Sequence, residues 1–131
     1  MRRRLIRFIV VCLSLASLAC EDPYVRGELG KVEYAVLLLE ECGVGCRPAP
    51  IAPFQEFAYL VRRVDRILTA VSSDEDVAHV ERVTPQYWQG ELEALQVYVT
   101  SQAEGEGQIE LYDGDELCDV LVVTVRADGL R

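Results

Sequence analysis

The sequence contains a single histidine, and its 13 lysines and arginines are outnumbered by 22 aspartates and glutamates, for a net charge of −9. One histidine leaves almost no room for imidazole catalysis or a histidine-rich metal site. Phosphate binding needs clustered lysine and arginine, so the acidic balance argues against a nucleic-acid partner. No apolar run reaches the ~20 residues that a membrane-spanning helix requires. A chain of 131 residues, half of them hydrophobic, accommodates one folded domain and a short leader.

Residues 1–19 have the layout of a secretory signal peptide. Their basic start consists of Arg2, Arg3, Arg4 and Arg7. An apolar run of 12 residues, 8–19, follows and ends in small side chains before Cys20. The segment resembles a bacterial lipoprotein signal peptide, in which the lipobox cysteine is acylated and becomes the first mature residue. Ser17 stands where such lipoboxes usually have leucine.

The resemblance implies that Cys20 carries the lipid and that the protein is exported to the bacterial cell envelope, with the outer membrane favoured. The alternative is an ordinary signal peptide cut after Ala19, with Cys20 as a disulfide partner. Loss of residues 1–19 removes four arginines and no acid, so the net charge changes from −9 to −13. Anionic headgroups would repel such a chain, so acyl chains would have to hold it on the membrane. Residues 20–30 are expected to form a tether that reaches at most ~33 Å.

Most of the mature chain has the alternation of apolar and polar residues that is typical of strands. It occurs over residues 32–39 and again over residues 95–99. Residues 119–125 are apolar on both faces, as in a central strand. Asp113-Gly114 is a strong signal for a tight turn. Many short strands separated by turns predict an all-β sandwich or barrel.

Residues 57–71 fit two structures. A helix would place six apolar side chains on one face, namely Phe57, Leu60, Val61, Val64, Leu68 and Val71. Two strands would use Phe57, Tyr59 and Val61 as one alternating run and residues 67–71 as a second, with a turn at 63–66. Periodicity slightly favours the helix, which would make the fold α+β.

The order of segments from Ile51 to Val125 resembles the bacterial immunoglobulin-like domains of group 2. The matching segments are the Ser72-Ser73-Asp74 turn with Val77-Ala78 and Val80, then Leu95-Gln96-Val97, residues 105–111, and the closing run 120–125. The resemblance implies a small Greek-key sandwich of two sheets over residues 31–127, with strands at 57–71 and no catalytic residues. The Cys–Trp–Cys spacing of antibody domains is absent, since Trp88 follows Pro85 in a loop-like stretch.

Few side chains indicate a catalytic, metal-binding or ligand-binding role. His79 lies in a strand-like segment and is expected to be structural. Two acidic clusters contain ligand types that Ca²⁺ prefers, but neither matches a calcium-binding loop, so solvated turns are the favoured interpretation; the clusters are Asp74, Glu75 and Asp76, and Asp113, Asp115, Glu116 and Asp119. A binding patch of Tyr87, Trp88 and Tyr98 is conceivable, although a rim of the core is the commoner role. Neither a metal nor a cofactor is expected.

The cysteines permit one disulfide in the mature domain. Cys12 leaves with the signal peptide and lipid takes Cys20, so Cys42, Cys46 and Cys118 remain. A local Cys42–Cys46 bridge is favoured, because the two glycines between them allow a tight turn. Cys118 would then be a small buried hydrophobic residue. The alternative joins Cys42 or Cys46 to Cys118.

These features together predict a lipid-anchored, non-enzymatic immunoglobulin-like module of the cell envelope that is structural, adhesive or protein-binding. The alternative is an accessory lipoprotein subunit of a periplasmic or outer-membrane machine. An enzyme is a third interpretation. The partners expected are the membrane, through Cys20, and a protein; the step from fold to binding rests on analogy.

Overall fold

The computed structural model describes residues 23–38, 43–44 and 50–129. The strands in these ranges are β1 (Val25–Arg26), β2 (Glu33–Leu38), β3 (Gly43–Val44), β4 (Glu56–Arg62), β5 (Thr69–Ser72), β6 (Ala78–Trp88), β7 (Glu91–Ser101), β8 (Gly105–Asp113) and β9 (Glu116–Val125). None of the described residues belongs to a helix long and apolar enough to cross a membrane.

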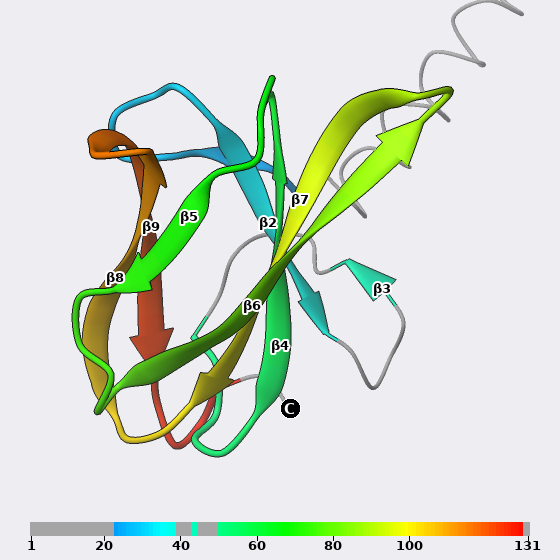
Figure 1. The fold of residues 1–131 in the computed structure, drawn as a ribbon. Coiled ribbons are helices and arrows are strands. Elements are labelled where there is room, and N and C mark those ends of the chain that lie inside the picture. Colours follow the sequence, from blue (N-terminus) through cyan, green and yellow to red (C-terminus); the bar gives the residue numbers. More distant parts are fainter. Residues whose placement is uncertain (1–22, 39–42, 45–49, 130–131) are drawn as a thin grey trace, which may run out of the picture.

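The strands form two antiparallel sheets that face each other (Figure 1). One sheet has the order β1-β2-β4-β7-β6, with β3 beside the end of β2, and the other has the order β5-β8-β9. If β2 and β4 to β9 are lettered A to G, the sheets read A-B-E-D and C-F-G, which is the arrangement of a constant-type immunoglobulin domain. The predicted all-β, immunoglobulin-like two-sheet sandwich is therefore confirmed.

The region that also fitted a helix consists of strands β4 and β5 joined by a turn, so the helical alternative is wrong. Phe57, Tyr59 and Val61 of β4 point into the core and are at most 2% exposed. β4 is hydrogen-bonded on both sides, to β2 and to β7. Paired strands on both sides satisfy the backbone of β4 as a helix would, and they also bury its alternating large side chains between the sheets.

Tyr59 joins the two sheets at the centre of the core. Its ring makes edge-to-face contacts with Tyr34 and Phe57, at centroid distances of 5.5 and 5.3 Å. Its hydroxyl donates a hydrogen bond of 2.9 Å to the carbonyl oxygen of Val122 in β9. The core therefore contains a polar contact between sheets that aromatic packing surrounds.

Strand β9 is an edge strand, whereas its sequence predicted a central one. Within its sheet it pairs with β8 alone, and its outer backbone groups bond to the β1–β2 turn and to residue 51. Glu28 N–H donates to Val120 O, and Ile51 N–H donates to Thr124 O. These segments block the outer edge of β9. Leu121, Val123 and Val125 are buried on its inner face, whereas Val122 and Thr124 on the other face are partly buried.

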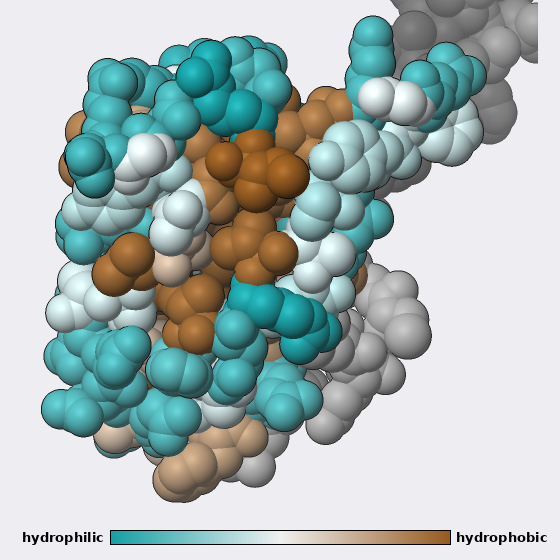
Figure 2. Space-filling model, viewed as in Figure 1, coloured by the Kyte–Doolittle hydropathy of each residue, from teal (hydrophilic) through white to brown (hydrophobic). Residues whose placement is uncertain are grey.

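The opposite side of the sandwich, between β5 and β6, is less covered. Figure 2 shows hydrophobic surface along this side. Val71 of β5 is 44% exposed, while Val80 and Val83 of β6 are partly buried against the core. Register shifts and Pro85 interrupt β6, and such irregularities discourage pairing with another strand.

Strand β6 includes the stretch around Pro85 and Trp88 that the sequence suggested was a loop. Pro85 is opposite Leu95 and Trp88 is opposite Glu91, so β6 and β7 form one long hairpin. Pro85 is tolerated because β6 is the outer strand of its sheet, where a missing N–H interrupts no ladder on the open side.

Candidate functional site

The connections β4–β5, β6–β7 and β8–β9 lie at the same end of the sandwich, with the β1–β2 turn (Figure 1). We call this end the loop end. Immunoglobulin-like variable domains use the corresponding end for recognition, because loops there vary without disturbing the sheets. The loop end of this protein contains a pocket and a projecting hairpin.

Asp119 fixes the β1–β2 turn against β9. Its side chain is fully buried, and its two carboxylate oxygens accept four backbone hydrogen bonds of 2.8 Å. Oδ1 accepts from Leu29 N–H and Val120 N–H, and Oδ2 accepts from Lys31 N–H and Val32 N–H. Asp119 is thus a structural acceptor, and the prediction that all four acids of this cluster belong to a solvated turn is wrong for it.

Gly27 allows the turn to approach this carboxylate. A Cβ atom at position 27 would collide with the carboxyl group of Asp119. The turn therefore requires glycine here for lack of space. Gly27 and Asp119 together place Lys31 at the mouth of the pocket.

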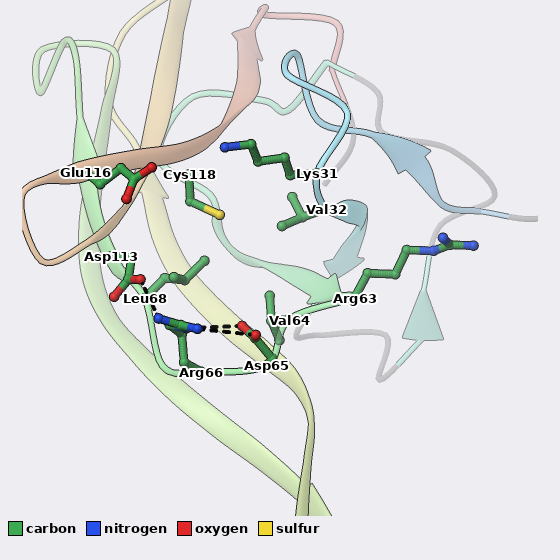
Figure 3. Close-up of a pocket in the computed structure, with 10 residues that line it drawn as sticks. All are labelled: Lys31, Val32, Arg63, Val64, Asp65, Arg66, Leu68, Asp113, Glu116 and Cys118. Carbon is green, nitrogen blue, oxygen red and sulfur yellow. Dashed lines mark hydrogen bonds and ion pairs between the residues drawn. The ribbon is translucent and has the colours of Figure 1, made fainter.

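The pocket has a volume of about 570 Å³ and opens between the two sheets. Its lining combines three basic side chains, three acidic ones, apolar residues and a thiol: Lys31, Val32, Arg63, Val64, Asp65, Arg66, Leu68, Asp113, Glu116 and Cys118. Figure 3 shows Lys31 and Cys118 on one wall and the Arg66 ion pairs on another. Because the lining has both basic and acidic side chains, it is suited to a ligand that carries positive and negative charges.

Arg66 connects the two loops that border the pocket. Its guanidinium lies 2.7 Å from Asp113 of the β8–β9 hairpin and 3.2 Å from Asp65 of its own loop. Hydrogen bonding to Arg66, followed by its positive charge, lowers the pKa of Asp65, and Asp65 and Asp113 raise the pKa of Arg66. All three side chains are solvent-exposed, so the ion pairs orient the loops more than they stabilise the fold.

Arg63 lines the pocket but extends away from it toward β2 (Figure 3). Its guanidinium lies 3.0 Å from Glu33, which Arg62 also contacts at 2.9 Å. Burial acts to raise the pKa of Glu33, but the two guanidinium groups outweigh that effect and the pKa is lowered. The ion pair with Glu33 of β2 therefore holds the Arg63 guanidinium against the sheet and away from the pocket.

Cys118, expected to be a small buried hydrophobic residue, is half-buried: it packs against the core and lines the pocket wall. Burial raises the pKa of its thiol, and Asp119 and Asp113 raise it further against the opposing effect of Lys31. A thiol with a raised pKa is protonated at neutral pH and is a poor nucleophile. Cys118 is the one cysteine among the described residues, so the alternative bridge from Cys42 or Cys46 to Cys118 stays a prediction.

His79 lies far from this pocket. It is opposite Thr100, near the end of the sandwich where β4 begins, and its Nδ1 is 3.7 Å from the Glu75 carboxylate. The structure thus does not bring Cys118 and His79 together. Asp74 caps its own turn by accepting a hydrogen bond from the backbone N–H of Asp76.

The three aromatic residues of the proposed patch are separated. Tyr87 and Trp88 are exposed at the tip of the β6–β7 hairpin. Tyr98 is half-buried on the sheet, where the Arg82 guanidinium lies 3.9 Å from its ring centroid. Arg82 precedes Trp88 by six residues of strand, or ~20 Å, so Tyr98 lies far from Tyr87 and Trp88, which are neighbours along β6 at the hairpin tip.

Three other predicted site residues, Cys20, Cys42 and Cys46, lie outside the described residues. Lipidation of Cys20 and the Cys42–Cys46 bridge therefore stay predictions.

The pocket itself had no sequence signal. Its lining comes from three segments that are separated by about 30 residues or more, at 31–32, 63–68 and 113–118. Only strand pairing brings these segments together. Comparisons with models of protein families, with curated proteins and with solved structures find no match to this chain.

Proposed function

We propose that the protein is a lipid-anchored component of the bacterial cell envelope whose immunoglobulin-like domain is a non-enzymatic binding module. The anchor rests on the signal-like segment and Cys20. The resemblance to bacterial immunoglobulin-like domains of group 2 agrees with the fold and implies no catalytic residues.

The arrangement of the loop end carries the binding proposal. Arg66 joins the β4–β5 loop to the β8–β9 hairpin around a pocket that exposes both signs of charge. Next to Arg66, the Ile67 side chain is 55% exposed. An exposed apolar side chain within a charged rim is typical of a protein-binding surface. The Cys118 thiol of the pocket lies far from His79, so the described residues do not pair these two side chains as a nucleophile and its base, which favours binding over nucleophilic catalysis.

Two experiments test the proposal. If Cys20 is acylated, cells should incorporate labelled fatty acid into the protein, and Cys20→Ser should abolish the label. A label retained in that variant would contradict the anchor.

The binding surface is tested by placing a photoreactive amino acid at Ile67. We expect a discrete crosslinked species in intact cells. Phe54 is the matched control, because its side chain is 83% exposed at the opposite end of the sandwich, before β4 begins. Equal crosslinking at both positions, or none at Ile67, would contradict recognition at the loop end.

A further inference from the structure

The β6–β7 hairpin extends beyond the body of its sheet. The pairing of β4 with β7 ends at Arg62 and Ala94, and residues 86–93 continue without a third strand. Gln89 and Gly90 both have positive φ, which is typical of the tight two-residue turns that rigidify hairpins. At this tip Trp88 is 66% exposed and Tyr87 is 59% exposed. Successive strand residues point to opposite faces, so the tip presents one large aromatic side chain on each side of the hairpin. Exposed aromatic side chains of this size indicate that the tip makes a contact.

The chain between Cys20 and the folded domain is much shorter than the tether predicted over residues 20–30. Val25 and Arg26 are already paired with β2, and Asp119 holds the backbone at residues 29, 31 and 32. The Tyr24 ring stacks on the Arg62 guanidinium at 3.6 Å. Only a few residues separate Cys20 from the sandwich, so a lipid on Cys20 would keep the domain against the membrane surface.

The strand register gives the position of the hairpin tip relative to Val25. Val25, Tyr34, Val61 and Leu95 form one row across the sheet. For strands ~4.8 Å apart, Leu95 is ~14 Å from Val25, and Trp88, which faces Glu91, is ~13 Å beyond that row. The five residues from Val25 back to Cys20 reach at most ~17 Å. Because β1 runs toward the loop end, the chain must reverse before Val25 for this reach to cover the ~13 Å to the level of Trp88.

We propose that the tip of the β6–β7 hairpin docks on the bilayer interface, with Trp88 and Tyr87 among the headgroups as a second contact beside the lipid. The inference rests on the proposed anchor at Cys20. Tryptophan and tyrosine are enriched at this depth, because their rings are apolar and their N–H and O–H groups remain hydrated. Glu91 and Glu93 are exposed on the same hairpin and the mature chain has a net charge of −13. The contact therefore requires a zwitterionic surface and is shallow.

Trp88 is the one tryptophan of the chain, so its fluorescence reports on the hairpin alone. The mature lipidated protein is reconstituted into vesicles of phosphatidylcholine and phosphatidylethanolamine, with and without bromine on the acyl chains. We expect the protein to float with both vesicles. Trp88 emission should shift to the blue relative to detergent-free delipidated protein, lose intensity in brominated vesicles, and become less accessible to acrylamide. The control combines Trp88→Phe with Phe54→Trp, which moves the reporter to the opposite end and should show none of these changes.

Each failure has a separate meaning. Protein that floats while Trp88 remains unquenched by bromine and open to acrylamide overturns the hairpin contact and leaves the anchor standing. Equal quenching of the Phe54→Trp reporter also overturns it, because the contact would not be specific to the hairpin. Emission that changes only when a second protein is added assigns the tip to a protein partner and overturns the bilayer proposal. Protein that does not float refutes the anchor, and the inference with it.

Discussion

The carboxylate of Asp119 offers a direct test of how the β1–β2 turn is held. In Asp119→Asn the side chain keeps its shape, but one oxygen becomes an NH₂ group. That group cannot accept hydrogen bonds, and it would face two backbone N–H donors, those of Leu29 and Val120 or those of Lys31 and Val32. We therefore expect the substitution to destabilise the folded state.

The magnitude follows from the two donors that lose their acceptor. An unsatisfied buried N–H costs ~1–3 kcal/mol, so the two donors should lower the free energy of unfolding of Asp119→Asn by ~2–6 kcal/mol. Removal of the buried charge opposes this loss, because a buried ion carries a desolvation penalty. The four hydrogen bonds of 2.8 Å indicate that the acceptor role dominates.

Urea unfolding followed by Trp88 fluorescence and far-ultraviolet dichroism measures the effect. Hydrogen exchange should show faster exchange of the Leu29, Lys31 and Val32 amides before global unfolding. Asp115→Asn is the matched control on the same hairpin, and because Asp115 is exposed it should change stability by less than ~0.5 kcal/mol. A neutral or stabilising effect of Asp119→Asn would refute the reasoning and show that desolvation of the charge outweighs its hydrogen bonds.

Other positions give further expectations. Gly27→Ala should destabilise the protein by ~1–3 kcal/mol in urea unfolding, because its Cβ would collide with the Asp119 carboxyl group; a neutral variant would mean that the turn can move away. Burial, and then Tyr34, raise the pKa of Tyr59 far above its ordinary value of 10.0. The unfolded state therefore loses its tyrosine proton first, and stability that is complete below pH ~10 should fall above it by up to ~1.4 kcal/mol per pH unit, a slope that Tyr59→Phe should reduce. Peptide mapping of the unreduced protein should show Cys42 joined to Cys46 by a disulfide. A disulfide-linked peptide that contains Cys118 would overturn this assignment.

Alternation along the sequence was sufficient for the strand predicted at residues 95–99. Leu95, Val97 and Val99 of β7 recur every second residue and are buried, and the Asp113-Gly114 signal coincides with the β8–β9 turn. The spacing from 57 to 71 also fitted a helix, because periodicity records which residues are apolar and not which strands pair with them. Pairing of β4 with both β2 and β7 decided between the two.

Contacts between residues far apart in the sequence decided the role of Asp119 and the position of the pocket. No local pattern distinguishes Asp119 from the neighbouring acids Asp113, Asp115 and Glu116, since all belong to one acidic hairpin. Asp119 differs because β9 places it beside backbone donors from residues 29–32, about 90 residues earlier in the chain. The same contacts shorten the tether and bring Lys31 to the pocket. The sequence alone therefore determined the fold class through local alternation, whereas the pocket, the buried carboxylate and the exposure of Trp88 depend on which distant segments the two sheets bring together.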